Sequence, residues 1–208
     1  MTNSSKISED LLSIGAISVQ PNDPFTWTSG MKSPIYCDNR ITMSYPEIRK
    51  RIVAAFVEII QKNYPDVEVI AGTATAGIPH AAWIAQSLDL PMVYIRSSAK
   101  KHGKGKQIEG TFSPGAKMVI VEDLVSTGSS VINAAQEAIN EEADVIGAVA
   151  IFTYELAVSA NAFKEIALPI HTITSYSNMI HVALEIGKIN EKDQMSLIRW
   201  KIDPENWQ

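Results

Sequence analysis

The feature that most constrains this chain is a run of four apolar residues, 118–121, followed at once by two acids, Glu122 and Asp123. Such a run is typical of a strand buried on both faces of a parallel sheet. A short turn rich in Ser, Thr and Gly follows at 126–130, and apolar residues then recur at helical spacing. The sequence therefore predicts a strand that delivers two carboxylates to the carboxyl edge of a sheet, where open α/β sheets bind ligands.

The turn at 126–130 has the composition of an anion-binding site. The first N–H groups of a helix lack internal partners and carry the positive end of its dipole. Gly128 lets the backbone approach a ligand closely, and the neighbouring hydroxyls can donate to phosphate oxygens. No Gly-Lys-Ser/Thr triplet follows, so this is not a Walker loop. An ordinary strand-to-helix turn with a Ser cap is the plainer alternative, and the acid pair favours a nucleotide-type site.

Apolar runs and helical spacings alternate along most of the chain. Strands are expected at 67–71, 91–96, 118–121, 144–152 and 170–174, and helices at 46–63, 78–88, 131–139, 158–166, 179–186 and 191–200. Two helix starts are predicted from polar residues, a capping box of Ser44 and Glu47 and a cap at Ser177. The alternation predicts one α/β domain over residues 1–208, with a mostly parallel sheet flanked by helices.

The N-terminal residues lie outside this alternation. A short amphipathic helix is expected to start near Ile7 and to end at Gly15. Two β-prone runs then flank Ser29-Gly30, which indicates a hairpin. We therefore expect the N-terminal residues to form a small subdomain added to the α/β domain.

Charge and composition exclude several classes of partner and location. The net charge is −5, so no bulk attraction to nucleic acid is expected. Cys37 is the only cysteine, so an internal disulfide is excluded. No apolar run approaches the roughly 20 residues that span a bilayer, and residues 1–10 are polar, unlike a signal peptide. These features predict a cytoplasmic protein with no membrane partner.

A long polar segment at 97–112 separates two expected core strands. Its centre, 100–106, alternates lysines with glycines, and loops of this length in compact domains tend to be functional. Lysines attract polyphosphate and glycines keep a loop mobile, which favours a lid. A solvated charge run and a nuclear-localisation-like run are the alternatives. The turn at 72–77 is a second small-residue cradle, a weak signal when taken alone.

Four segments agree in order and spacing with one family. They are 25–34, 72–79, Arg96 with 100–105, and 121–130. Together they resemble the orotate phosphoribosyltransferase family of the type I phosphoribosyltransferases, and the resemblance covers nearly the whole chain. The Glu-Asp to Ser-Thr-Gly order marks the wider type I group. The Ser-Gly-x-Lys-Ser-Pro stretch and the Lys-x-His-Gly segment narrow the resemblance to the orotate-specific members.

The resemblance implies a fold, a reaction and an assembly. The fold is an α/β sheet with a small N-terminal hood subdomain, about 1–43 with C-terminal contributions, and a mobile lid, about 97–112. The reaction transfers the ribose 5-phosphate of 5-phosphoribosyl 1-diphosphate (PRPP) to orotate, giving orotidine 5′-monophosphate and pyrophosphate in de novo UMP synthesis. Mg²⁺ is the implied cofactor, held mainly by the substrate diphosphate and ribose hydroxyls without a dedicated protein ligand. The implied assembly is a homodimer in which each lid closes over the neighbouring site.

The same resemblance implies roles for individual residues. Catalytic roles fall to Lys100, His102 and Asp123. PRPP binding is implied for the strand end, both turns and the lid: Ala74, Thr75, Arg96, Lys100, His102, Glu122, Asp123, Leu124, Val125, Ser126, Thr127, Gly128, Ser129 and Ser130. Orotate binding is implied for Ser126 and for three hood residues, Lys32, Tyr36 and Cys37.

Three positions depart from the family pattern, and three other functions stay open. Some members carry Lys, Lys and Arg where this chain has Thr28, Ala76 and Glu155. The alternative functions are a purine phosphoribosyltransferase, a nucleotide-sensing regulator on the same fold, and a structural α/β domain. The hood motif argues against the first and the acidic balance against the second. The agreement of four segments argues against the third.

Overall fold

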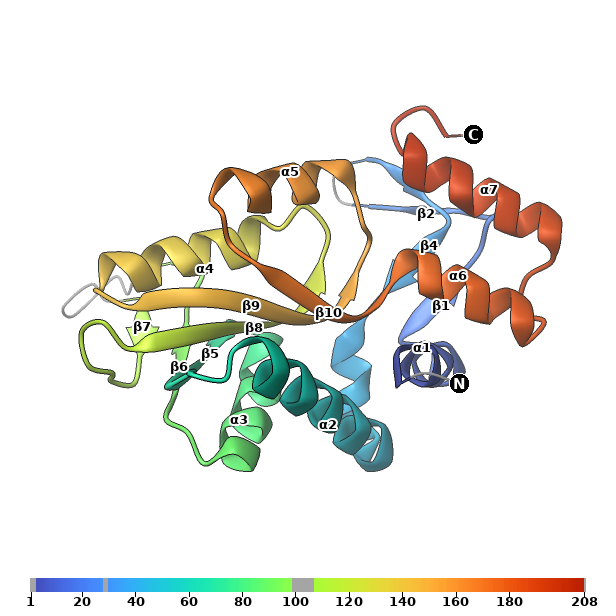
Figure 1. Cartoon of the computed structure of the whole chain (residues 1–208). Coiled ribbons are helices and arrows are strands. Elements are labelled where there is room, and N and C mark those ends of the chain that lie inside the picture. Colours follow the sequence, from blue (N-terminus) through green and yellow to red (C-terminus); the bar gives the residue numbers. More distant parts are fainter. Residues whose placement is uncertain (1–2, 28–29, 99–106, 208) are drawn as a thin grey trace.

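A six-stranded sheet lies at the centre of the molecule (Figure 1). The computed structural model describes residues 3–27, 30–98 and 107–207. The strands of the sheet are β5 (Val69–Thr73), β6 (Met92–Ile95), β7 (Ile108–Glu109), β8 (Lys117–Val125), β9 (Asp144–Thr153) and β10 (Ile170–Ser175). Their order is β10-β9-β8-β5-β6-β7, and every pair is parallel except β6 with β7.

Helices cover both faces of this sheet. In chain order they are α1 (Asn3–Ser13), α2 (Pro46–Asn63), α3 (Gly77–Leu88), α4 (Ser129–Asn140), α5 (Ala157–Glu165), α6 (Tyr176–Glu185) and α7 (Glu191–Ile202). Figure 1 shows α4 and α5 over one face and α2 and α3 under the other. This arrangement confirms the predicted α/β fold class. None of the described helices is both long and apolar enough to cross a membrane.

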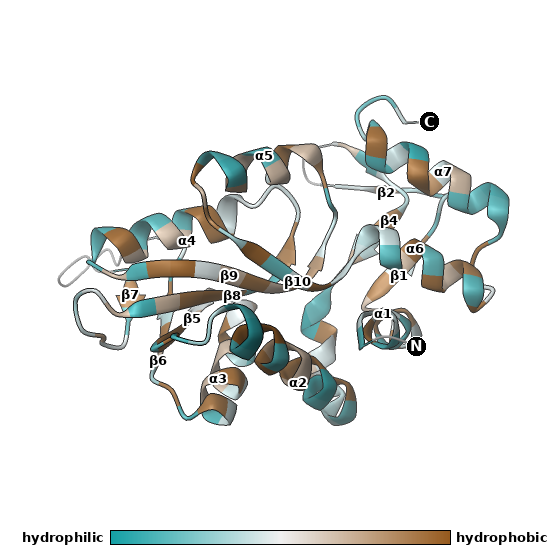
Figure 2. Ribbon diagram, in the orientation of Figure 1, coloured by the Kyte–Doolittle hydropathy of each residue, from teal (hydrophilic) through white to brown (hydrophobic). Residues whose placement is uncertain are grey.

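Strand β8 explains the apolar run that dominates the sequence. Val119 and Val121 belong to the core under α2 and α3, whereas Met118 and Ile120 belong to the core under α4 and α5. All four side chains are fully buried. Because helices cover both faces of a parallel sheet, both sides of its central strands must be apolar. Figure 2 shows this as brown along β8 and β9, with teal on the outer faces of the helices.

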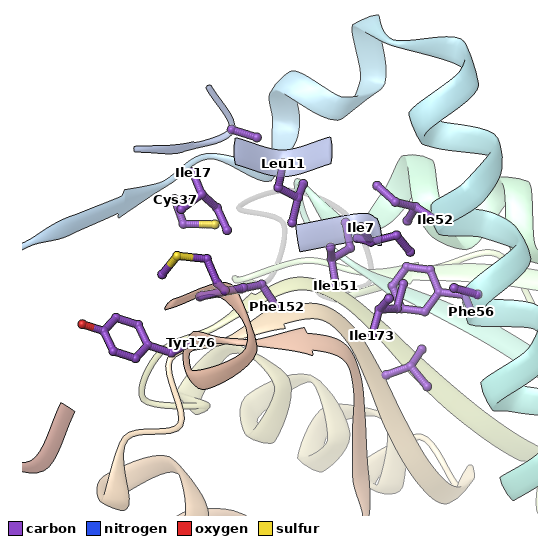
Figure 3. Close-up of a cluster of buried hydrophobic side chains, with 14 of the residues drawn as sticks. Ile7, Leu11, Ile17, Cys37, Ile52, Phe56, Ile151, Phe152, Ile173 and Tyr176 are labelled. Atoms are coloured by element: carbon purple, nitrogen blue, oxygen red, sulfur yellow. The ribbon is translucent and has the colours of Figure 1, made fainter. Parts of the chain in front are cut away.

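The N-terminal hood consists of two short antiparallel pairs. Strand β1 (Ile17–Val19) pairs with β4 (Ile35–Cys37), and β2 (Phe25–Thr26) pairs with β3 (Lys32–Ser33). A 3₁₀ helix, η1 (Asn39–Ser44), connects the hood to α2. Figure 3 shows hood residues Ile17 and Cys37 in one apolar cluster with Ile151 and Phe152 of β9. The hood therefore shares its core with the main sheet, and its division from the rest at about residue 43 stays a prediction.

Three local predictions are wrong. Ser44 is the last residue of η1, so Tyr45 is the N-cap of α2 and no capping box forms with Glu47. Ser177 lies inside the first turn of α6, because β10 runs directly into that helix and Ser175 caps it. The acids do not end their strand either: β8 continues to Val125, since its pairing with β9 extends that far.

Candidate active site

The predicted ligand edge coincides with a reversal of the strand order. From β5 the chain moves outward to β6 and β7, then returns to the other side of β5 as β8. Open α/β sheets bind ligands at such a switch point, outside the carboxyl ends of the strands. The turn after β5, 74–76, and the turn after β8, 126–128, therefore meet at one crevice.

Strand β8 projects beyond β5 at this crevice. The pairing of β5 with β8 ends at Val121, where the Thr73 hydroxyl donates to the Val121 carbonyl at 3.1 Å. A Cβ at Gly77 would collide with that same carbonyl, so the close packing of α3 on β8 requires glycine there. The two acids consequently lie on a strand segment that has β9 on one side and the crevice on the other.

The carboxyl groups of the acid pair have different surroundings. Glu122 is 5% exposed and accepts hydrogen bonds from the Ser130 hydroxyl at 2.8 Å and from the Asp123 N–H at 3.0 Å. The side chain of Asp123 is only partly accessible. Burial, followed by the negative charge of Glu122, raises the pKa of Asp123 to about 7. An added cation or hydroxyl donor at this carboxyl would therefore favour its ionised form.

The turn after β8 keeps the features expected of an anion cradle. Gly128, the N-cap residue of α4, has φ +84° and no side chain with which to cap the helix. The Ser129 N–H donates weakly to the Thr127 hydroxyl at 3.5 Å, and the first turn of the helix faces the ligand edge with the positive end of its dipole. A Cβ at Gly128 would lie 2.7 Å from the Phe163 ring, which is a second reason for glycine. The Thr127 and Ser129 hydroxyls lie 3.1 Å apart, at the mouth of the turn.

Two cavities meet at this turn. The larger, about 690 Å³, lies under the hood and is lined by residues that include Tyr36, Cys37 and Ser126. The smaller, about 420 Å³, lies beside the end of β5 and is lined by residues that include Arg96 and Ser129. A phosphate at the turn would thus have one cavity on each side.

Most of the predicted site residues gather at these cavities, but not all of them do. Ala74, Leu124, Thr127 and Ser130 line one cavity or the other, together with the residues already named. Thr75 lies in the turn after β5 without lining either. The Val125 side chain is buried in the core, so only its main chain is available to a ligand. Lys100 and His102 lie outside the described residues.

Lys32 lies at the rim of the larger cavity. Its ammonium group donates to the Thr26 hydroxyl at 2.7 Å across the β2–β3 pair, and the Thr26 side chain lines the cavity. The Lys32 side chain is exposed and is not itself part of the lining.

The structure accounts for one departure from the family pattern. The Glu155 carboxylate accepts hydrogen bonds from the Ser177 N–H and from the Lys201 ammonium group, each at 2.8 Å. It therefore fastens the start of α6 to the end of α7 and does not line the hood cavity. Ala76 is the N-cap residue of α3 and provides no cation. Thr28 lies outside the described residues.

Two residues at the site had no role in the sequence analysis. Tyr154 follows β9 and lines the hood cavity, where burial raises the pKa of its phenol. Asn39 follows β4, is fully buried, and donates to the Asp123 carbonyl at 2.7 Å. The position of Tyr154 at the end of a predicted strand was a usable signal. No local sequence pattern indicates the contact of Asn39, because its partner is 84 residues away.

Known proteins resemble this chain over nearly its whole length. A model of the phosphoribosyl transferase domain matches residues 44–174. An orotate phosphoribosyltransferase from Enterococcus faecalis (strain ATCC 700802 / V583) is 59% identical over 202 residues, covering 97% of this chain and 96% of the relative. The orotate phosphoribosyltransferase of Aeropyrum pernix has a similar structure, with a TM-score of 0.76 at 21% identity over 88% of this chain and 99% of that one.

A further solved relative was determined with a phosphate-containing ligand. The orotate phosphoribosyltransferase of Mycobacterium tuberculosis, solved in complex with PRPP, matches with a TM-score of 0.66 at 20% identity. It covers 86% of this chain and 99% of that one. At this identity the likeness concerns the fold. The family match and the full-length identity of 59% together establish that the chain belongs to the orotate phosphoribosyltransferase family.

Proposed function

We propose that this chain transfers the ribose 5-phosphate of PRPP to orotate, giving orotidine 5′-monophosphate and pyrophosphate in pyrimidine synthesis. The observation that carries the proposal is the meeting of two cavities at one anion cradle beside a carboxylate pair. A 5′-phosphate in the cradle would bring the ribose to the acids, with the base on one side and the diphosphate on the other. The name of the relative at 59% identity supports orotate as the base.

The hood cavity is the proposed orotate site. Tyr36 and Cys37 form its hood side, and Ser126 forms the side next to the phosphate turn. Orotate carries a carboxylate, and Lys32 at the rim is a cation within the same subdomain. Release of its hydrogen bond with Thr26 would let Lys32 meet that carboxylate, which gives the lysine a role in selecting orotate over neutral bases.

The crevice beside the acids is the proposed PRPP site. Glu122 and Asp123 would accept the ribose hydroxyls, and the main chain and hydroxyls of 124–130 would hold the 5′-phosphate. Ala74, Thr75 and Arg96 would line the diphosphate in the smaller cavity. Lys100 and His102 of the lid would add cations above it. Water exclusion by the lid would strengthen every one of these charge interactions.

The chemistry needs positioning and electrostatics rather than a protein nucleophile. The orotate ring nitrogen attacks C1′ as the bond to the diphosphate breaks, which leaves positive character on the ribose and negative charge on the leaving group. An ionised Asp123 favours this state, since its charge lies beside the developing cation. The carboxylate oxygens of the acid pair also suit Mg²⁺ bound to the substrate. When bound, Mg²⁺ supplies neutralisation of the leaving diphosphate.

The assembly and location are further parts of the proposal. We infer a homodimer in which each lid covers the neighbouring site, with orotate and PRPP as the small-molecule partners. A cytoplasmic location without nucleic-acid or membrane partners is part of the proposal, and the acidic charge balance supports the absence of a nucleic-acid partner.

A base screen tests the reaction. With PRPP and Mg²⁺, orotate should be consumed, and adenine, hypoxanthine and uracil should not. The measurement is the loss of orotate absorbance, with product identified by chromatography for the other bases. Comparable turnover of a purine would reject orotate as the base, and no pyrophosphate release with any base would reject the transferase activity itself.

A further inference from the structure

Two side chains bond the main chain of Asp123 inside strand β8. Pairing of β8 with β5 ends at Val121, while its pairing with β9 continues past Asp123 to Val125. The Asp123 N–H donates to the Glu122 carboxylate at 3.0 Å. The Asp123 carbonyl accepts from the Asn39 side-chain amide at 2.7 Å. The acid that is proposed to meet the ribose therefore has two side-chain contacts at its main chain in addition to the β8–β9 pairing.

Asn39 is itself held in one orientation. Its side chain is fully buried, and its amide oxygen accepts from the Cys37 thiol at 3.4 Å. Burial raises the pKa of Cys37, so the thiol stays protonated and remains a donor. A thiol that donates to the amide oxygen leaves the amide nitrogen free to donate to Asp123. The two contacts thus agree on which way the amide points.

The position of Asn39 links both substrate cavities. Cys37 lines the hood cavity. Asp123 lies on β8, three residues before the turn that borders both cavities, and is the residue proposed to meet the ribose. Asn39 begins η1, whose first residues are further fixed by the Thr42 hydroxyl, which donates to the Asn39 carbonyl at 2.6 Å. The Asn39 side chain therefore connects the hood residue Cys37 with the Asp123 main chain.

We propose that Asn39 is a positioning residue for transfer, whose amide fixes the Asp123 carbonyl and thereby the direction in which the Asp123 carboxylate meets the ribose. This inference rests on the proposed function, because it gives Asp123 its role at PRPP. The residue touches no substrate group itself. Its loss should reduce turnover by removing this side-chain donor from the Asp123 carbonyl.

Two substitutions separate this role from simple support of the fold. Asn39→Leu keeps the approximate volume and removes both polar atoms, and we expect a loss of about tenfold to a hundredfold in kcat/KM for PRPP. Asn39→Asp keeps the shape, but an ionised carboxylate cannot donate to the Asp123 carbonyl, whereas a protonated one can. Its activity relative to the unmodified protein should therefore rise as the pH falls from 8.5 to 6.

The expected pH profile differs between the two variants. Cys37, Asp38 and Arg40 on the hood side and Glu122 and Asp123 on the β8 side titrate or carry charge near this position. Activity is therefore expressed as a ratio to the unmodified protein at each pH. The ratio should stay flat for Asn39→Leu, which has nothing to protonate. A flat or falling ratio for Asn39→Asp overturns the proposal, even where the leucine variant fails to fold.

Thr42→Val is the matched control. It removes the hydrogen bond that the Thr42 hydroxyl donates to the Asn39 carbonyl and leaves the Asn39 amide and Asp123 in contact. We expect its kcat/KM to stay within about threefold of the unmodified protein. An equal loss in the control, or full activity in a folded Asn39→Leu variant, overturns the positioning role. Absence of orotate turnover in the unmodified protein would instead reject the proposed function, so the two failures are distinguishable.

Discussion

At the scale of single residues, the acid pair is arranged at a cost to the folded state. Two adjacent carboxyl groups lie near the end of the buried strand β8, and burial with the Glu122 charge raises the pKa of Asp123 to about 7. A carboxyl group near this value changes its charge when a hydroxyl donor or a cation arrives. The substrate would therefore meet a site that becomes fully ionised as it binds.

Asp123→Asn should alter the pH dependence of stability. An acid whose folded pKa is raised binds more protons when folded, so its contribution is favourable at low pH and is lost as the pH rises from about 4 to about 7. Asp123→Asn has no carboxyl group at this position, so it does not lose stability in this way as the pH rises. Its free energy of unfolding minus that of the unmodified protein should increase by about 1–3 kcal/mol between pH 4.5 and pH 8, since partial solvent access reduces the full linkage.

Urea unfolding at the two pH values measures this difference. Asp38→Asn provides a control, because the hydrogen bond with Arg40 lowers the pKa of Asp38. Its contribution to stability is present above the unfolded pKa of about 4 and is lost only below it, so the stability difference for this variant should be nearly the same at pH 4.5 and at pH 8. If the Asp123→Asn difference is the same at both pH values, the carboxyl of Asp123 is not perturbed in the folded protein.

At the scale of elements, long regular segments were predictable and short ones were not. Strand β8 is indicated by a run of apolar residues and helix α2 by their helical spacing, and both patterns are local in the sequence. Strand β1 has three residues and β7 has two, and each exists because a distant partner completes it. The two wrong helix caps have the same cause, since the preceding element decides which residue is left at the N-cap.

The candidate site was predictable to the same extent. Its acids lie near the end of β8 and its two cradles follow β5 and β8, so apolar runs in the local sequence mark them. Contacts between residues far apart in the sequence are not marked in this way. The Asn39 contact with Asp123 arises from the packing of η1 on the end of β8, and Glu155 became a structural residue because Lys201 of α7 lies beside it. Such pairs depend on how elements meet.

The last helix, α7, supports the wall of the hood cavity. Trp200 of α7 is fully buried, and its indole N–H donates to the Lys32 carbonyl at 2.8 Å. Its ring lies edge-on to Trp27 at 5.7 Å and to Tyr154 at 6.0 Å, and both of these residues line the hood cavity. Helix α7 therefore fixes the position of the β2–β3 pair.

Trp200→Phe should loosen that cavity. The variant loses the indole donor and leaves a small void, so we expect a loss of about 1–3 kcal/mol in unfolding free energy. The KM for orotate should rise more than the KM for PRPP, because the affected wall belongs to the base cavity. Trp207→Phe is the matched control, since its indole bonds Ser196 instead and does not line the cavity. Equal changes in both KM values would contradict a selective role of α7.

At the scale of the whole molecule, the smaller cavity, which we propose for the diphosphate, is bordered by the residues on either side of the proposed lid. Arg96, Ser97 and Gln107 line this cavity, and they flank residues 99–106, which lie outside the described part of the chain. Arg96 also contacts Glu109 of β7 at 3.5 Å, so the two ends of the proposed lid are close together. A closed site would then need the lid cations from this subunit or from its neighbour.

Mixing of two impaired variants distinguishes a lid that covers its own site from a lid that covers the neighbouring site. Lys100→Ala removes a lid cation, and Asp123→Asn removes a charge-assisted acceptor for a ribose hydroxyl, with an expected loss of about tenfold to a hundredfold in kcat/KM. Each homodimer has two impaired sites. If the lid acts on the neighbouring site, a hybrid dimer combines both lesions at one site and has an intact second site. Random exchange of equal amounts makes half the dimers hybrid, so activity should recover to roughly a quarter of the unmodified level.

The recovery must depend on subunit exchange to support a shared lid. The two variants are mixed, exchange is allowed, and orotate loss is measured against each variant alone and against a mixture kept from exchanging. If each lid covers its own site, every site keeps one lesion and the exchanged mixture shows only the average of its parents. That average would rule out the shared lid but leave the reaction intact, because the transfer requires only that lid cations reach the diphosphate. A concentration-dependent recovery would further tie activity to the dimer, since dilution below the dissociation constant separates each lid from its partner site.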